Sequence, residues 1–396
     1  MKTATGVLPA APTEAETFQT EDVLSIVGGH FINDTYSAFF PTLLPLLIEK
    51  LSLSLTQAGL LSAIPQIPSL LNPFIGYLAD RLSLRYFVIF APGMTATFFS
   101  LMGLAPNFAT LAILLFASGI SSAAFHAPAP AMIAKISGRQ LGKGMSLFMA
   151  GGELGRTIGP LLAVWGVTTW TLEGFWRLMV FGWAATVILF LRLHNIHARP
   201  SRQQGIASML PLARRIALPL ITIVVLRFFA VSSISIYLPT FMDAEGATLW
   251  VAGGALAITQ AAGVAGALLS GSLSDRWGRR QILMLSIGGG GIFLLMFLNV
   301  SGWLLVPVLL LLGLFMLSTQ PVLLAVVQEQ FPEHRALANG LFMLVTFAAQ
   351  SLTILFVGWF SDRFGLRNAY FVSAMLSLAA LPIIFFLPVK VRQVEA

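Results

Sequence analysis

Three polar side chains interrupt the first long apolar run of the chain and are the first candidates for chemistry. His30, Asn33 and Asp34 are spaced three and four residues apart, so they share one face of a helix. A charged side chain at the centre of a bilayer costs about 3 kcal/mol on insertion scales, so we expect this face to point into the protein. Burial disfavours a charged carboxyl, which makes Asp34 the leading proton-carrier candidate, with His30 beside it. A neutral, structural hydrogen-bond network is the alternative.

A second charged pair lies in the stretch Gly-Gly-Glu-Leu-Gly-Arg-Thr-Ile-Gly-Pro at residues 151–160. Glu153 and Arg156 are three residues apart and can form an ion pair on one helix face. Either the pair only neutralises itself, or a substrate or proton opens it, which makes Glu153 a further proton-coupling candidate. Four-residue glycine spacing predicts a groove for a closely packed helix, and the motif comprises Gly151, Gly155, Gly159 and Pro160.

Other polar residues inside apolar segments are candidates for the lining of a substrate cavity. His126 precedes two prolines and has no cysteine partner and no histidine four residues on, so we expect it to contact a proton or substrate rather than a metal. Arg156 and Arg227 stay charged and present a fork that fits carboxylate or phosphonate, which predicts that the cavity accepts molecules with a negative group. The other cavity candidates are Asn33, Gln66, Tyr237, Gln260, Gln320 and Gln350.

The composition places the chain among membrane proteins. It is 57% hydrophobic and 10% charged, whereas soluble domains are roughly 25% charged. The net charge of +7 comes mostly from loop residues, so we expect the lipid bilayer and no nucleic acid as a partner. The sequence has no cysteine, no phosphate-binding lysine motif, no His-Glu-x-x-His and no Gly-x-Ser-x-Gly, so we expect no cofactor, no metal site and no enzymatic activity.

Twelve apolar segments are long enough to cross a membrane, which predicts an all-α integral membrane protein made of two six-helix bundles. The expected parts are a cytoplasmic tail at 1–22, a bundle at 23–193, a loop at 194–215, a bundle at 216–389 and a tail at 390–396. The segments are 24–47, 56–79, 86–105, 109–133, 143–169, 174–193, 216–242, 250–273, 281–300, 303–328, 336–360 and 369–389.

One hydrophilic stretch occurs twice, half a chain apart. Gly-Tyr-Leu-Ala-Asp-Arg-Leu-Ser-Leu-Arg at 76–85 returns as Gly-Ser-Leu-Ser-Asp-Arg-Trp-Gly-Arg-Arg at 271–280. A repeat at half the length predicts two similar membrane halves in the same orientation. These loops could act in gating or only anchor helix ends. Their residues are Gly76, Asp80, Arg81 and Arg85 in the first copy, and Gly271, Asp275, Arg276, Gly278, Arg279 and Arg280 in the second.

Basic residues outside the apolar segments predict the orientation. With the N-terminus inside, seventeen Lys and Arg residues fall on the inner side and four on the outer side, so we expect both termini in the cytoplasm. A third copy of the loop, at residues 358–367, argues the other way, because helix counting places it outside.

The repeated loop resembles the signature of the major facilitator superfamily. The second copy fits it fully, while the first has Ser83 in place of a glycine and Leu84 in place of a base. The Gly-Pro at 159–160 resembles the fifth-helix motif of antiporters and exporters in that superfamily. The resemblance implies the major facilitator fold and a monomeric transporter.

Three further stretches narrow the resemblance to the fosmidomycin-resistance family of bacterial drug exporters. They are His-Phe-Ile-Asn-Asp at 30–34, Ser-Ala-Ala-Phe-His-Ala-Pro at 122–128, and residues 146–162 around the glycine motif. Gln-Glu-Gln-Phe-Pro at 328–332 followed by Asn339 and Gly340 fits the same family. One departure is that Glu153 and Arg156 stand where the exporters have uncharged polar residues.

The resemblance implies proton-coupled efflux of small drug-like molecules, including anionic, fosmidomycin-like ones, across a bacterial inner membrane by alternating access. The partners would be the small-molecule substrate and protons. Because of the two departing charges, uptake or export of an anionic metabolite is the second hypothesis. A membrane sensor without transport is the third. A sensor would ordinarily carry an added soluble domain, and the longest candidate for one is the loop at 194–215.

Overall fold

The structure is a computed structural model of the chain, and it describes residues 17–71, 84–194, 210–331 and 335–388. All regular elements within these ranges are helices. Most of the predicted tails and of the predicted loop at 194–215 lie outside the described residues, and so do Gly76, Asp80 and Arg81 of the first repeated loop.

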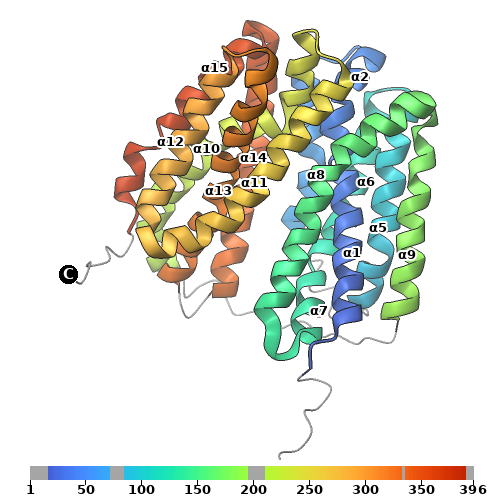
Figure 1. Cartoon of the computed structure of the whole chain (residues 1–396), viewed down its shortest axis with the longest axis horizontal. Coiled ribbons are helices and arrows are strands. Elements are labelled where there is room, and N and C mark those ends of the chain that lie inside the picture. The colour runs from blue at the N-terminus through green and yellow to red at the C-terminus, as the bar shows by residue number, and fades with distance from the viewer. Residues whose placement is uncertain (1–16, 72–83, 195–209, 332–334, 389–396) are drawn as a thin grey trace, which may run out of the picture.

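The described helices fall into two groups that stand side by side (Figure 1). The first group, blue to green, comes from the N-terminal half. It contains α1 (Thr20–Ser37), α2 (Phe39–Leu51), α3 (Leu55–Ala63), η2 (Ile64–Leu71), α5 (Leu84–Leu101), η3 (Met102–Leu104), α6 (Phe108–His126), α7 (Ala129–Ile136), η4 (Gly138–Gln140), α8 (Leu141–Gly174), η5 (Phe175–Leu178) and α9 (Met179–Leu193).

The second group, yellow to red in Figure 1, comes from the C-terminal half. Its helices are α10 (Leu210–Ala244), α11 (Leu249–Trp277), α12 (Arg279–Phe297), η7 (Gly302–Leu304), α13 (Leu305–Gln330), α14 (Arg335–Phe364), α15 (Leu366–Leu378) and η8 (Pro382–Phe386). We call the two groups the N-terminal and the C-terminal bundle.

Nine helical segments of the described residues are long and apolar enough to cross a membrane. One of them, residues 143–193, is 51 residues long and holds α8 and α9, which the sequence predicts as two separate spans. The predicted span 24–47 is not among the nine, and a turn at Ala38 divides it into α1 and α2. The predicted span 56–79 runs into residues outside the described part. The all-helical architecture is confirmed, and the number twelve stays a prediction.

The two bundles contact each other at the end where α3 begins and α14 ends. A Cβ atom on Gly59 of α3 would lie 2.6 Å from the Tyr237 hydroxyl of α10 and 3.0 Å from the Ile354 carbonyl oxygen of α14. A Cβ on Gly253 of α11 would lie 2.7 Å from Val164 of α8. The main apolar core runs across this contact. We call this the closed end of the molecule.

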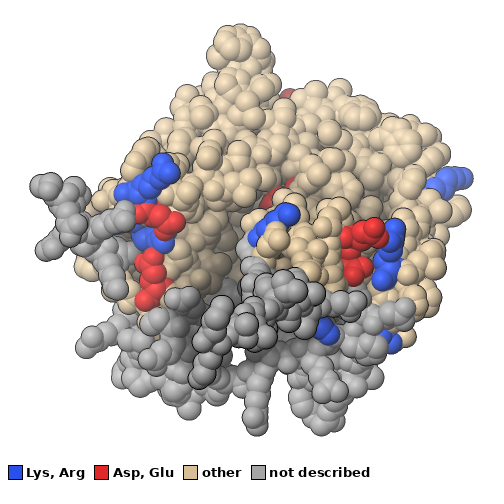
Figure 2. Space-filling model, turned by 60° about the horizontal axis from the view of Figure 1, so that its bottom comes forward, with Lys and Arg blue, Asp and Glu red and all other residues tan. Residues whose placement is uncertain are grey.

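A second, smaller apolar core lies in the N-terminal bundle alone, where α1 begins and α9 ends. It includes Val23, Ile26, Phe125, Phe148 and Leu193. This is the end at which the sequence places most of its basic residues, and we call it the basic end. Figure 2, turned so that this end comes forward, shows charged side chains near the rim and acidic atoms set back in a recess between tan surfaces.

The glycines of α8 lie against α1, and this contact gives a stability prediction. A Cβ on Gly155 would overlap the carbonyl oxygen of Phe31, whereas one on Gly28 of α1 would meet no atom within 4 Å. We therefore expect Gly155→Ala to lower the melting midpoint of the purified protein, at an overpacking cost of about 1–3 kcal/mol. Gly28→Ala is the matched control and should leave the midpoint unchanged or raise it. Equal midpoints for the two variants would contradict the packing argument.

Candidate functional site

The carboxylate of Asp34 is the centre of a buried polar cluster in the N-terminal bundle. Its side chain is only 3% exposed. Arg156 Nη1 donates to Asp34 Oδ2 at 3.0 Å, and Asn33 Nδ2 donates to Oδ1 at 3.1 Å. His30 Nε2 lies 3.4 Å from Oδ2, and His126 Nε2 lies 3.3 Å from Oδ1. One carboxylate thus meets side chains from three helices.

Helix geometry explains how these groups converge. The four-residue spacing places His30 and Asp34 on the same face of α1. Helix α8 packs on that face and brings Arg156, while His126 is the last residue of α6. Room for the cluster depends on Gly152 of α8, because a Cβ there would lie 2.5 Å from His30 Nε2 and 3.0 Å from Asp34 Oδ2.

Backbone carbonyls fix the orientation of both imidazole rings. His30 Nδ1 lies 2.7 Å from the carbonyl oxygen of Phe148, and His126 Nδ1 lies 2.9 Å from that of Ser122. A carbonyl oxygen only accepts hydrogen bonds, so each Nδ1 carries its hydrogen. In the neutral ring, Nε2 is then the unprotonated nitrogen. Both rings therefore present a lone pair to Asp34.

This arrangement lacks a hydrogen when both rings are neutral. The two Nε2 atoms are 3.2 Å apart, and both face the Asp34 carboxylate. Two nitrogen lone pairs and a carboxylate repel one another unless a cation or proton lies between them. One proton bound at either Nε2 turns a repulsive contact into a charge-assisted hydrogen bond.

The ion pair predicted between Glu153 and Arg156 is present, and it extends the cluster toward the surface. Arg156 Nη2 bonds to Glu153 Oε1, while Nη1 of the same guanidinium binds Asp34. The side chains of Arg156, His126 and Glu153 are 38%, 37% and 22% exposed, respectively. With neutral rings, two carboxylates and one guanidinium leave one negative charge, which a single bound proton cancels.

The side chains around Asp34 are also of the types that bind metal ions. His30, Asp34 and His126 each offer one atom within 4.8 Å of the others. However, the Arg156 guanidinium is 3.0 Å from the same carboxylate and would repel a divalent cation. A proton adds one charge instead of two, and it therefore suits this charge balance better.

The other candidate cavity residues do not all join this cluster. Asn33 does, and its Oδ1 accepts a hydrogen bond from Thr95 at 2.9 Å. Tyr237 is fully buried at the closed end, where it donates to the Ile354 carbonyl oxygen at 3.0 Å. Arg227 is buried in the C-terminal bundle, where it donates to Gln320 at 2.6 Å. Three glutamines are half-buried on separate helices, namely Gln66, Gln260 and Gln350.

The second repeated loop makes its contacts inside the C-terminal bundle. Gly278 has a φ of 100°, which favours glycine, and joins α11 to α12. Arg279 binds Asp275 at 2.6 Å and Glu329 at 2.8 Å, so it ties α11, α12 and α13 together. Arg280 donates to the Phe385 carbonyl oxygen at 3.1 Å. The remaining described loop residues belong to helices, with Gly271 and Arg276 in α11 and Arg85 in α5.

The third copy of the loop joins the two bundles. The carboxylate of Asp362, in α14, accepts hydrogen bonds from the backbone N–H groups of Leu55 at 2.7 Å and Thr56 at 2.8 Å. The Thr56 hydroxyl also donates to it. These residues lie at the closed end, the end that helix counting in the sequence places outside.

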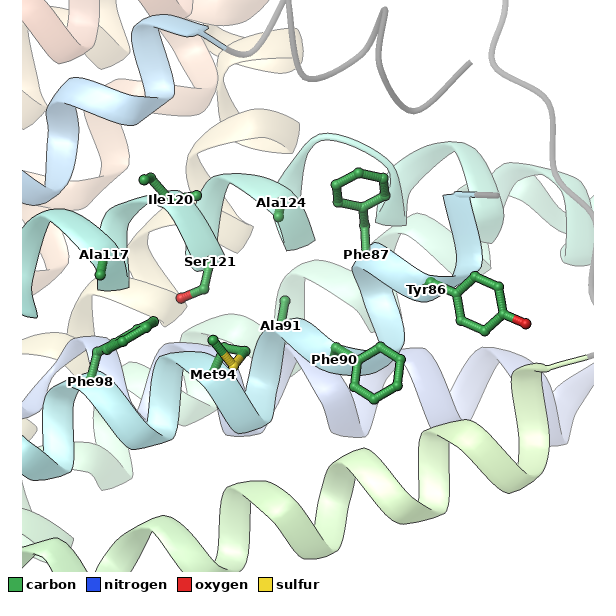
Figure 3. A pocket seen from close by; sticks show the side chains of 10 residues that line it. All are labelled: Tyr86, Phe87, Phe90, Ala91, Met94, Phe98, Ala117, Ile120, Ser121 and Ala124. Atoms are coloured by element: carbon green, nitrogen blue, oxygen red, sulfur yellow. The ribbon is translucent and has the colours of Figure 1, made fainter. Parts of the chain in front are cut away.

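One cavity of the described residues lies on the flank of the N-terminal bundle and includes none of the charged residues of the cluster. It is a groove of about 650 Å³ between α5 and α6, and aromatic and aliphatic side chains line it (Figure 3). Its lining includes Tyr86, Phe90, Met94, Phe98 and Ile120. An apolar groove on the flank of a membrane-spanning helix pair suits lipid chains. It offers no charged group that could select a substrate.

The sequence profile of the Major Facilitator Superfamily matches residues 26–349 and 257–395, which together cover most of the chain. The chain belongs to this superfamily. The family predicted from the repeated loop is therefore confirmed, and with it the all-α membrane fold.

Two curated relatives match almost their whole length. The "Uncharacterized MFS-type transporter YfnC" of Bacillus subtilis (strain 168) is 25% identical, with 96% of this chain and 97% of the relative covered. The "Fosmidomycin resistance protein" of Escherichia coli (strain K12) is also 25% identical, with 95% and 96% covered. The second of these agrees with the resemblance found in the sequence.

Solved structures of other superfamily transporters share the fold. A bacterial homolog of the human lysosomal transporter Spinster, in an inward-facing conformation, superposes with a TM-score of 0.77 at 14% identity, covering 92% of this chain and 96% of that one. A D-xylose-proton symporter also gives 0.77, at 15% identity, covering 94% and 98%. At these identities the likeness shows the fold alone. Membership of the superfamily makes the protein a major facilitator transporter.

Besides the bond from Arg156 to Asp34, the sequence does not reveal three further parts of the site. The contact between His126 and Asp34 depends on the packing of α6 against α1. The carbonyl partner at Phe148 and the space at Gly152 depend on the packing of α8. The only signal in the sequence was that all these positions lie in the three stretches that resemble the drug exporters.

Proposed function

We propose that the protein is a proton-coupled secondary transporter that exports small drug-like molecules, including anionic ones, by alternating access. The observation that carries the proposal is the pair of carbonyl-fixed imidazoles that turn two lone pairs toward Asp34. A site that lacks one hydrogen while both imidazoles are neutral is suited to bind and release one proton. The name of the Escherichia coli relative, a fosmidomycin resistance protein, supports the export of a drug.

In this proposal, Arg156 couples the proton to the substrate. Its guanidinium bridges Asp34 and Glu153. A carboxylate or phosphonate that binds the exposed part of Arg156 competes with these two carboxylates for the same N–H groups. The binding of the substrate and the charge state of Asp34 are therefore linked through one guanidinium.

The proposal includes the setting of the protein. The chain works as a monomer in a bacterial inner membrane, with both termini in the cytoplasm and the closed end outside. The recess at the basic end then faces the cytoplasm, from which an exporter takes its substrate. The excess of basic residues at this end supports the orientation.

Transport into inverted membrane vesicles tests the proposal. A panel of anionic and neutral drug-like compounds and carboxylate metabolites is offered under an imposed proton gradient, and a pH-sensitive dye reports proton release. We expect anionic compounds to discharge the gradient. Arg156→Gln should reduce the preference for anionic over neutral compounds by about tenfold, since one charge-assisted hydrogen bond contributes about 1.5–3 kcal/mol. Arg363→Gln is a control at the closed end and should keep the preference.

The outcomes separate the competing hypotheses. A response to carboxylate metabolites alone would support the second hypothesis, the transport of an anionic metabolite. Export without any dye response would contradict proton coupling. No transport under either direction of the gradient would overturn the proposed function.

A further inference from the structure

Arg227 carries a buried positive charge that no acidic side chain of the described residues neutralises. It is 5% exposed and lies at the middle of α10, a helix of 35 residues. Its Nη2 donates to Gln320 Oε1 at 2.6 Å, and its guanidinium lies 4.6 Å from the centre of the Phe228 ring. Both partners are uncharged. The Nε and Nη1 groups are buried without a hydrogen-bond partner among the described residues.

Arg227 also lines a small cavity inside the C-terminal bundle, whose wall is mostly apolar and includes three residues with hydroxyl groups. Four helices form its wall, with Arg227 from α10, Ser286 and Gly290 from α12, Thr319 from α13 and Ser377 from α15. The cavity leaves about 10 Å³ for the centre of a water-sized sphere. This volume is near the minimum that holds one water molecule, so the cavity is too small for a drug or a carboxylate metabolite.

An unpaired guanidinium and hydroxyl groups together suit a small anion. A guanidinium stays charged at every physiological pH, and leaving it unpaired inside a membrane protein is costly. A monatomic anion would neutralise the charge of the guanidinium. It can accept hydrogen bonds from the free N–H groups of Arg227 and from the neighbouring hydroxyl groups. Met316, which also lines the cavity, has a flexible side chain that can adjust to an ion slightly larger than water.

We propose that Arg227 and the surrounding hydroxyls bind one halide ion, chloride in the cell, inside the C-terminal bundle. The ion completes the packing of α10, α12, α13 and α15. This site is separate from the Asp34 cluster in the other bundle, so the proposal does not depend on the direction of transport or on the transported substrate.

The test compares purified full-length protein in chloride and in gluconate at the same ionic strength, so that screening is equal. Because a ligand that binds the folded state stabilises it, we expect chloride and bromide to raise the melting midpoint by about 2 °C or more. Arg227→Gln should remove this difference. Arg363→Gln should retain it, because Arg363 is an exposed residue stacked 4.5 Å from the Trp359 ring centre at the closed end.

A second variant keeps the proposal testable if Arg227→Gln does not fold. Ser286→Ala removes one hydroxyl and should raise the chloride concentration needed for half of the shift by about tenfold. Crystals soaked in bromide should show an anomalous peak beside Arg227. The proposal is overturned if chloride and gluconate give equal midpoints, if Arg227→Gln keeps the full difference, or if bromide binds only elsewhere.

Discussion

Replacing Asp34 by asparagine should abolish proton-driven accumulation while downhill exchange of substrate continues. With one proton exchanged per neutral substrate, a gradient of about two pH units supports an accumulation of about 100-fold, because each pH unit supplies about 1.4 kcal/mol. The Asp34→Asn protein should stop near equal concentrations on both sides. Substrate accumulation in sealed inverted vesicles measures the first property, and counterflow without a pH gradient measures the second.

The expected loss follows from the contacts of the carboxylate. Asparagine has nearly the same shape, but it brings a donor amide to a position that now faces His30 Nε2 and His126 Nε2. The amide NH2 can donate a hydrogen bond to one of these nitrogens. The site then no longer needs a proton from solution. Arg156 keeps its ion pair with Glu153 in the variant, so we expect the rest of the cluster to stay folded.

A matched control lies on the same helix. Asp22 is also an acid of α1, but it lies in the first turn, away from the cluster. Asp22→Asn should therefore keep the full accumulation. If Asp34→Asn also reached the accumulation of the unaltered protein, Asp34 would be excluded as the proton carrier. Glu153→Gln would then be the variant to measure next.

The parts of this site that follow from spacing along one helix could be predicted from the sequence. The three- and four-residue intervals of His30, Asn33 and Asp34 define a face whatever the neighbours are. The same holds for Glu153 and Arg156, whose ion pair is present. That Arg156 also binds Asp34 could not be predicted, because it depends on the distance at which α8 and α1 pack.

The contacts of a residue are harder to predict from the sequence when they depend on how the helices pack. The position of Arg227 near the middle of its helix was predictable by counting residues, but whether its side chain faces the space between the bundles or the interior of one bundle depends on the rotation of α10. The sequence makes it a candidate for the lining of a substrate cavity, and in the structure it is buried among C-terminal helices. For Asp362 the binding partners are backbone N–H groups, which no residue type reveals.

The bonds of Asp362 at the closed end lead to the second large expected effect. The first turn of a helix has N–H groups without partners inside the helix. In α3, Ser54 caps one of them through a capping box with Gln57. The carboxylate of Asp362, from the other bundle, accepts hydrogen bonds from the N–H groups of Leu55 and Thr56. A negative charge at a helix N-terminus is also favourable for the helix dipole.

In the proposed alternating-access cycle this contact must break when the transporter opens at the closed end, because the bundles separate there. Each hydrogen bond to a charged group contributes about 1.5–3 kcal/mol when buried, but Asp362 is exposed and water weakens the contribution. We therefore expect Asp362→Ala to shift the equilibrium toward opening at this end by about tenfold, not by the full sum of the bonds.

The chain has no cysteine, so one introduced thiol can report this opening without background. Thr42 of α2 suits the purpose, because it is fully buried and its Cγ2 would lie 3.5 Å from a Cβ on Gly253 in the other bundle. In the Thr42→Cys background, Asp362→Ala should speed labelling by a membrane-impermeant maleimide, added at the closed end, by about tenfold. Asp243→Ala removes an exposed acid of α10 at the same end and should leave the rate unchanged. An Asp362→Ala rate equal to that of the background would show that the apolar packing of α3 against α14 holds this end shut without the carboxylate.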